Sequence, residues 1–255
     1  MIRTIMKNME LITIIILSIV GFIASFIGVT VGGGGLLSIP ALIFLGLPPQ
    51  IAIATNKVGS LGIMSSIYRF NKSRMVNFKI GIPLALVSIV GAYIGATTLL
   101  TLPEEIIGKL IGIFILIVLV FVILNRNVGV EKREKQGKTK RYLGYLLFLF
   151  VGFWGGIFGG GYGVFATYVL IFMFGQTFLE SAGTKKVLGL GISIVSVIVF
   201  AIGGIINWEY GIALLPGMAL GSHFGADYGI KKGDKWVRTL FIIVVAVSAA
   251  KLILG

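Results

Sequence analysis

Long apolar stretches separated by short polar breaks follow one another along almost the whole chain. They cover residues 9–46, 50–69, 79–100 and 105–125 in the first half, and 142–174, 179–206, 209–228 and 236–254 in the second. Most are about as long as the 20 or so apolar residues that a helix needs to cross a bilayer. They do not alternate polar and apolar residues as the strands of a membrane barrel do. The pattern predicts an all-α polytopic membrane protein with about eight transmembrane helices.

The first stretch of each half is too long for one straight helix across a membrane. At 1.5 Å per residue, thirty or more helical residues exceed a hydrocarbon core of about 30 Å. A glycine cluster lies inside each stretch, at Gly32–Gly35 and at Gly159–Gly163. Each glycine disfavours a helix by about 1 kcal/mol relative to alanine, so we expect both helices to break at these clusters. Unwound backbone at membrane depth is tolerated where it lines a cavity or is buried in protein.

The two halves of the chain also repeat each other. A shift of 129 residues pairs Gly32 with Gly161 and Lys57 with Lys186, and a shift of 130 residues applies further along. Transporters are commonly built from such repeats, with the substrate site at the repeat interface. We therefore divide the chain into two homologous four-helix repeats and a loop. The predicted segments are a first transmembrane repeat at 1–126, a basic cytoplasmic loop at 127–141 and a second transmembrane repeat at 142–255.

The basic residues predict an orientation, because positively charged loops usually stay in the cytoplasm. Seven of the 22 Lys and Arg residues lie within 126–141. If each half crosses the membrane four times, both termini, this loop and the 69–79 loop are cytoplasmic, and the 174–180 turn is outside. The 231–238 segment disagrees, since its four basic residues would also lie outside. An inverted repeat is the alternative.

Composition supports a membrane protein and narrows the chemistry. The chain is 57% hydrophobic and 12% charged, with a mean hydropathy of +1.04. It has no cysteine and one histidine, which argues against thiol chemistry and histidine metal clusters. Acidic residues are nearly absent from the apolar stretches, so we expect no enzyme, no cofactor and no metal. We assign the net charge of +13 to loops beside anionic lipid headgroups, and expect no nucleic-acid partner.

Two lysines interrupt the apolar stretches at matching positions, Lys57 and Lys186. A charge at bilayer depth usually faces a cavity or a substrate path, so we interpret the pair as part of an anion site. A lysine can instead reach the membrane surface along its own apolar stem, and this alternative stays open. We assign that snorkelling role to Lys185, because it points to a different helix face.

Broken-helix N-termini and neutral polar groups would complete the anion site. Hydroxyl and amide groups can donate hydrogen bonds to an oxyanion, or can bond to a helix carbonyl instead. The predicted substrate-binding residues are Gly32, Gly33, Gly34, Gly35, Thr55, Asn56, Lys57, Gly159, Gly160, Gly161, Gly163, Thr184 and Lys186. We interpret the aromatic residues around the second cluster, Tyr162 among them, as packing or lipid-facing residues. Many other glycines, such as Gly91 and Gly221, fit close helix packing better.

His223 and Asp227 lie four residues apart and share a helix face. Histidine titrates near neutral pH, so the pair is a candidate proton relay in coupled transport. The alternative, which we favour, is a structural role in which Asp227 pairs with Lys231 or Lys232.

These motifs resemble those of the TauE/SafE sulfite exporter family, also called the TSUP transporters, over almost the whole chain. The matching residues are Gly32–Leu42, Gly46, Pro48 and Ala54–Lys57 in the first half, and Gly155–Gly163, Gly175 and Thr184–Leu188 in the second. The resemblance implies about eight helices from a duplicated four-helix unit. It also implies transport of small anions, often containing sulfur, such as sulfite, sulfoacetate, thiosulfate or related organic acids.

We therefore expect a multi-pass transporter of the cell membrane, the inner membrane of a bacterium or archaeon, that exports a small anion by alternating access. An anion channel and a membrane protein without transport activity are the alternatives. The expected partners are the anionic substrate, the lipid bilayer and a coupling proton or sodium ion. The sequence does not determine the oligomeric state.

Overall fold

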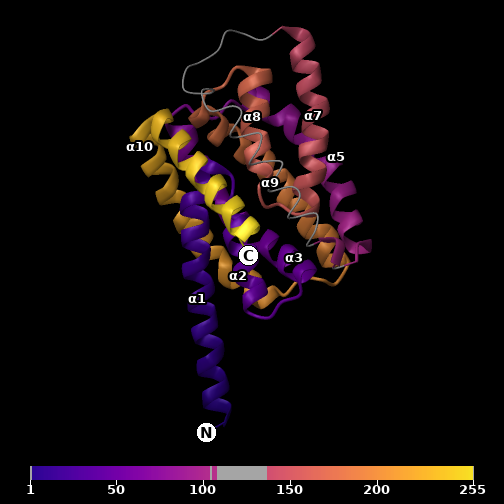
Figure 1. Ribbon diagram of the computed structural model, residues 1–255, viewed down its shortest axis with the longest axis vertical. Helices are drawn as coiled ribbons and strands as arrows, with labels where there is room; N and C mark the ends of the chain where they lie inside the picture. Colours follow the sequence, from indigo (N-terminus) through magenta and orange to yellow (C-terminus); the bar gives the residue numbers. More distant parts are fainter. Residues whose placement is uncertain (1, 104, 108–136, 255) are drawn as a thin grey trace.

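The computed structural model describes residues 2–103, 105–107 and 137–254, and every element in these ranges is helical (Figure 1). The elements are α1 (Ile2–Val31), α2 (Gly35–Phe44), α3 (Pro49–Ser60), the 3₁₀ helix η1 (Leu61–Met64), α4 (Ser65–Lys72), α5 (Phe78–Thr101), α7 (Lys138–Ile157), α8 (Tyr162–Phe174), α9 (Phe178–Ile202) and α10 (Trp208–Leu254). The predicted all-α class is confirmed for this part of the chain. Residues 108–125 of the last apolar stretch of the first half and most of the basic loop lie outside the described residues, so eight crossings and the proposed division into segments stay predictions.

Among the described residues, three helical segments are long and apolar enough to cross a membrane: Ile12–Thr30, Phe78–Thr101 and Phe178–Ile202. α2 and α8 are shorter apolar helices. Large apolar side chains on the outside, such as Leu86 and Ile198, are more than half exposed. An exposed apolar surface of this kind suits a protein surrounded by lipid.

Both glycine clusters break their helices as predicted. α1 ends at Val31, Gly32 has a φ of +91°, and α2 begins at Gly35. In the second half, α7 ends at Ile157 and α8 begins after Gly159 and Gly161, whose φ angles are +73° and +76°. Glycine enters this left-handed region without the steric strain that a Cβ atom causes.

Glycine stripes set the direction of neighbouring helices. Gly91 of α5 lies against Leu149 of α7, and Gly95 lies against Phe153, four residues further along both helices. The corresponding contacts between α10 and α1 pair Gly217 with Ser18, Gly221 with Phe22 and Gly225 with Phe26. α5 therefore runs parallel to α7, and the part of α10 before Gly233, where a φ of +82° interrupts the helix, runs parallel to α1. These contacts confirm the predicted packing role of these glycines, which let two backbones approach closely.

Connections between helices gather at two ends of the molecule. At one end, the α4–α5 connection and the α8–α9 turn line the same surface pocket. Asp234 there accepts a backbone hydrogen bond from the start of α9, at 2.7 Å. At the opposite end, Gln50 Nε2 donates a hydrogen bond to the carbonyl of Leu99 at 2.6 Å, which joins the start of α3 to the end of α5.

The internal repeat of the sequence pairs α1 with α7. These two helices run in opposite directions in the structure (Figure 1). The prediction that the 174–180 turn lies on the opposite side from the 69–79 loop is wrong, because the two segments line one pocket, and the inverted repeat stays a prediction. The reason is the glycine break. It turns the chain back, so that α2 returns toward the end where α1 begins. The basic residues of 69–79, 137–141 and 231–235 thus share one end, which we call the basic end.

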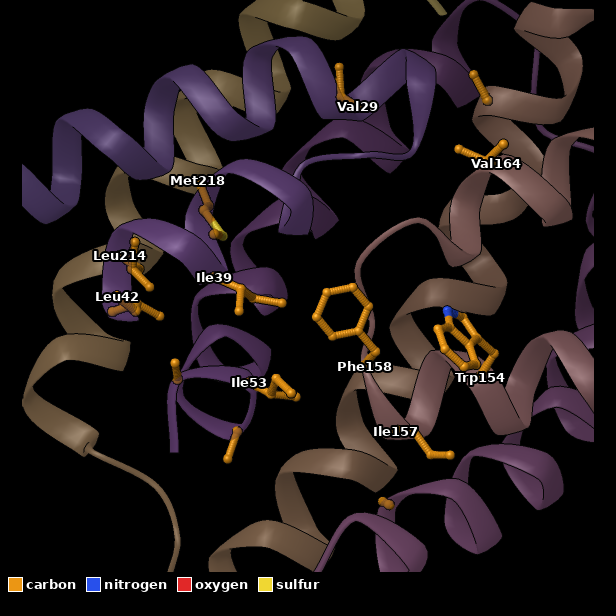
Figure 2. Packing of buried hydrophobic residues seen from close by; sticks show 14 of the residues in the cluster. Val29, Ile39, Leu42, Ile53, Trp154, Ile157, Phe158, Val164, Leu214 and Met218 are labelled. Atoms are coloured by element: carbon orange, nitrogen blue, oxygen red, sulfur yellow. The ribbon is translucent and has the colours of Figure 1, made fainter. Parts of the chain in front are cut away.

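The two halves interlock rather than pack side by side. α5 of the first half packs against α7 and α9 of the second, whereas α10 packs against α1 and α3. The apolar core crosses the same boundary: Figure 2 shows the Phe158 ring, from the α7–α8 break, pointing toward Ile39 and Ile53 of the first half. This arrangement brings the two helix breaks together.

Candidate functional site

The two helix breaks are in direct backbone contact. A Cβ atom built on Gly32 would lie 2.6 Å from the carbonyl carbon of Gly163, and one built on Gly35 would lie 3.0 Å from Cα of Gly160. Such distances leave no room for side chains. The structure confirms that the breaks face each other, and their depth in the membrane stays a prediction.

A cavity of about 70 Å³ lies between the breaks. Eight of the predicted site residues line it: Gly32, Gly34, Gly35, Asn56, Lys57, Gly159, Gly163 and Lys186. Five predicted residues do not line it: Gly33, Thr55, Gly160, Gly161 and Thr184. α1, α3, α9 and α10 contribute the other walls, so both halves of the chain build this cavity.

Two buried lysines hold the ends of the broken helices. Lys57 is 2% exposed, and its Nζ donates a hydrogen bond to the carbonyl of Gly155 in the last turn of α7. Lys185 is 1% exposed, and its Nζ donates to the carbonyl of Thr30 in the last turn of α1, at 2.8 Å. The final carbonyls of a helix lack intrahelical partners, so each lysine satisfies an acceptor that the glycine break exposes. The snorkelling interpretation of Lys185 is therefore wrong.

Lys186 differs from the other two lysines. It is 7% exposed and lines the cavity, yet none of the described residues accepts a hydrogen bond from its Nζ. A buried cation without a partner is strongly unfavourable. Lys186 is thus the lysine of this cavity whose charge the protein itself leaves uncompensated.

The electrostatics of the cavity favour an anion. Lys57, Lys185 and Lys186 all line it, and none of its described lining residues is Asp or Glu. The N-termini of α2 and α8 also begin at the cavity, and neither has a side-chain cap. Helix N-termini carry a partial positive charge and backbone N–H groups that bind anions. In the described part of the chain, His, Cys, Asp and Glu do not gather in groups of three or more that could hold a metal ion.

Neutral hydrogen-bonding groups complete the lining. Asn56 Oδ1 accepts a hydrogen bond from the hydroxyl of Ser38, at 2.6 Å. The hydroxyl groups of Ser60 and Ser193 lie 3.0 Å apart, and both residues line the cavity. These two serines were not predictable from the sequence, because isolated serines in apolar helices are common and carry no distinctive spacing.

The hydroxyl groups of Thr55 and Thr184 each accept a backbone hydrogen bond just before a long helix of the other half. The hydroxyl of Thr55 accepts a hydrogen bond from the backbone N–H of Asn207 at 3.0 Å, before α10. The hydroxyl of Thr184 accepts one from Asn77 at 3.1 Å, before α5. The structure does not bring either threonine to the cavity, and their role in anion binding stays a prediction.

His223 and Asp227 lie away from the cavity lining. Asp227 forms an ion pair with Arg69 in the last turn of α4, so its assignment to Lys231 or Lys232 is wrong. Lys231 and Lys232 are the nearest basic residues along α10, but the fold packs α4 and its Arg69 against α10. His223 makes an edge contact with Phe224, with ring centroids 5.8 Å apart.

Tyr162 lines the cavity, although the sequence suggested a packing or lipid-facing residue. It is the first residue of α8. Its ring lies against two glycines: a Cβ on Gly155 would sit 3.5 Å from Tyr162 Cγ, and a Cβ on Gly189 would overlap the hydroxyl group. One feature of the sequence could have indicated this position. The repeat of the two halves pairs Tyr162 with Gly33, so an aromatic residue replaces a glycine within the second cluster.

Comparison with known proteins assigns a family to this architecture. The family model described as "Sulfite exporter TauE/SafE" matches residues 17–252. A "Probable membrane transporter protein" of Haemophilus influenzae is 31% identical over 240 residues, which cover 93% of each chain. The "Probable membrane transporter protein YfcA" of Escherichia coli K12 is 30% identical over 247 residues, covering 93% of this chain and 88% of that protein. "Probable membrane transporter protein YunE" of Bacillus subtilis is 26% identical, covering 94% of this chain and 97% of the relative. No solved structure matches the chain.

Proposed function

Since this chain belongs to the sulfite exporter TauE/SafE family of membrane transporters, we propose that it carries small anions across the cell membrane and binds them in the cavity between the helix breaks. The substrate class is small oxyanions and sulfonates, with sulfite as the first to test. The observation that carries this proposal is the set of three buried lysines in a cavity whose described lining holds no carboxylate.

An anion in this cavity would offset the unfavourable burial of Lys186. The lysine has no acceptor among the described residues, and a bound oxyanion supplies one. The uncapped N-termini of α2 and α8 add further N–H donors. Lys57 and Lys185 contribute positive potential while they hold the helix ends.

The position of the site suits alternating access. Lys57 follows the first residue of α3 by eight residues, and Lys186 follows the first residue of α9 by eight. At 1.5 Å per residue both lie about 12 Å inside their helices, approached from opposite ends of the molecule. We propose that two inverted four-helix repeats rock about this central cavity, as in transporters with inverted repeats.

The basic end then faces the cytoplasm, because basic residues of three loops gather there. This orientation places the start of α1 outside, as a consequence of the turn at the first glycine cluster. The 231–235 segment lies at the basic end with the other two basic segments. Its positive charge conflicted with a parallel arrangement of the two halves.

Transport assays with purified protein in proteoliposomes test this function. Sulfite loaded inside the vesicles should leave at a saturable rate, and external sulfite should accelerate exchange of labelled sulfite. Lys186→Met should lower the apparent affinity while the melting temperature is retained. Flux that never saturates and shows no exchange would favour a channel. Absence of both flux and binding for sulfite, sulfate, thiosulfate and sulfoacetate would overturn the proposal.

A further inference from the structure

The polar cavity shares one wall with a second, apolar pocket. This pocket has a volume of about 470 Å³, and its lining consists of aromatic and aliphatic side chains of α7 and α8, such as Trp154 and Phe165. Of the described residues, Tyr162 is the one that lines both spaces. Its ring thus separates a small, lysine-lined cavity from an apolar space several times larger.

Tyr162 is held in this position by the local backbone. Gly161, with a φ of +76°, turns the chain directly before it, and Tyr162 then begins α8. Gly155 and Gly189 leave room for the ring and its hydroxyl group, since a Cβ at either position would meet them. The hydroxyl group has no hydrogen-bond partner among the described residues, although the residue lines a polar cavity.

The volumes indicate what the cavity admits. A cavity needs about 10–15 Å³ of volume of this kind to hold one water molecule, so about 70 Å³ holds about five to seven, which is the size of a compact anion of a few heavy atoms. A butyl or phenyl group attached to the anionic head does not fit in the same space. Such a group would need the apolar pocket, and the Tyr162 ring stands in the way.

We propose that Tyr162 determines substrate size: its hydroxyl group donates a hydrogen bond to the bound anion, and its ring excludes anions that carry an apolar tail. This inference rests on the proposed function of the cavity as an anion site. The proposed selectivity depends on Tyr162, the aromatic residue of the second glycine cluster. The corresponding residue of the first cluster is Gly33.

Removing the ring should therefore join the two spaces and change the order of preference. In Tyr162→Ala, the sulfonate head remains beside Lys186 while an alkyl tail enters the apolar pocket. Each buried methylene strengthens binding about fourfold. Butanesulfonate has three methylenes more than methanesulfonate, so its affinity for the variant should be up to about sixtyfold higher than that of methanesulfonate.

Calorimetric titration of the purified full-length protein with methanesulfonate, butanesulfonate and benzenesulfonate tests this prediction, with sulfite as the reference anion. The wild type should bind sulfite and methanesulfonate and reject the two larger sulfonates, and Tyr162→Ala should reverse this order. Tyr162→Phe should keep the size limit and bind methanesulfonate about tenfold more weakly, because only the hydroxyl group is lost. Phe165→Ala is the matched control. It changes the apolar pocket without touching the cavity, so its preference should equal that of the wild type.

The outcomes separate the two proposals. If the wild type binds none of the anions, the proposed function fails. If it binds methanesulfonate and Tyr162→Ala keeps the same order, the role of the ring is overturned while the anion site stands. Wild-type affinity in Tyr162→Phe would overturn the role of the hydroxyl group. If Tyr162→Ala does not fold, Tyr162→Leu replaces it, since leucine fills part of the space and should shift the preference in the same direction.

Discussion

Replacing Lys186 by methionine isolates anion binding from folding. Methionine is similar in length to lysine, carries no charge and cannot donate a hydrogen bond. Because Lys186 Nζ has no acceptor among the described residues, the folded protein loses no internal hydrogen bond in this variant. Removal of an uncompensated buried charge should leave the melting temperature unchanged or raise it.

Anion binding should respond in the opposite way. A charge-assisted hydrogen bond to a bound oxyanion contributes about 1.5–3 kcal/mol, which corresponds to about a tenfold to hundredfold loss of affinity in Lys186→Met. Equilibrium binding of sulfite to the purified protein measures the effect, and thermal unfolding without the anion measures stability.

The same substitution at Lys57 and Lys185 provides the comparison. Each of these lysines bonds a carbonyl at the end of a broken helix. Leaving that buried acceptor unpaired should lower the free energy of unfolding by about 1–3 kcal/mol, in addition to any loss of affinity. If Lys186→Met binds sulfite as tightly as the wild type, the anion does not contact Lys186. If all three variants are equally destabilised, the distinction between holding a helix end and binding an anion is refuted.

Further predictions concern the backbone, one ion pair and the orientation. Gly32→Ala combines a left-handed φ with a Cβ 2.6 Å from the opposing backbone, and should lower the free energy of unfolding by about 2–5 kcal/mol in thermal or denaturant unfolding. Arg69→Ala should cost about 1 kcal/mol, because the pair with Asp227 is partly exposed, and exchanging the two residues should restore much of it. Single cysteines at Lys231 and Thr101 should react with an impermeant thiol reagent from the cytoplasmic side and from outside, respectively, since the native chain has no cysteine.

Each of these experiments has a control. Gly137→Ala should be neutral, since a Cβ there meets nothing within 4 Å and its φ of −61° is ordinary. A melting temperature for Gly32→Ala equal to that of Gly137→Ala would contradict the contact between the breaks. Single alanines at Arg69 and Asp227 that lower stability independently would contradict the ion pair. Labelling of cysteines at Lys140 and Lys231 from different sides would contradict the shared basic end.

The sequence predicted those features that depend on local chemistry. Clustered glycines destabilise a helix wherever they occur, so the breaks at Gly32 and Gly159 were predictable from the local sequence alone. Buried cations require a cavity or a partner, so Lys57 and Lys186 indicated an internal site. The repeat placed both on related helices, and the cavity does unite them.

Features that depend on how helices face one another were not predictable. The direction of the second half depends on whether the first stretch crosses or turns back, and hydropathy is the same in both cases. Lys185 lies on a different face of α9 from Lys186, yet both line the cavity because α1 and α8 close around that helix. Thr55 and Thr184 are neighbours of site residues along the chain, but their hydroxyl groups face the next long helix.

The lysines that hold the helix ends also affect how the protein is made. Lys57 donates a hydrogen bond to the end of α7 in the second half, and Lys185 donates one to the end of α1 in the first half. The main packing partner of α1 is α10. Ser18 and its neighbour Gly217 are separated by 199 residues, which a ribosome adds in about 10–40 s. During that interval α1 has neither its partner helix nor the lysine that donates a hydrogen bond to the carbonyl of Thr30 in its last turn. In the nascent chain, α1 therefore waits for Lys185 and α10, which are synthesised much later. Shortened products that lack these partners should be substrates for membrane proteases.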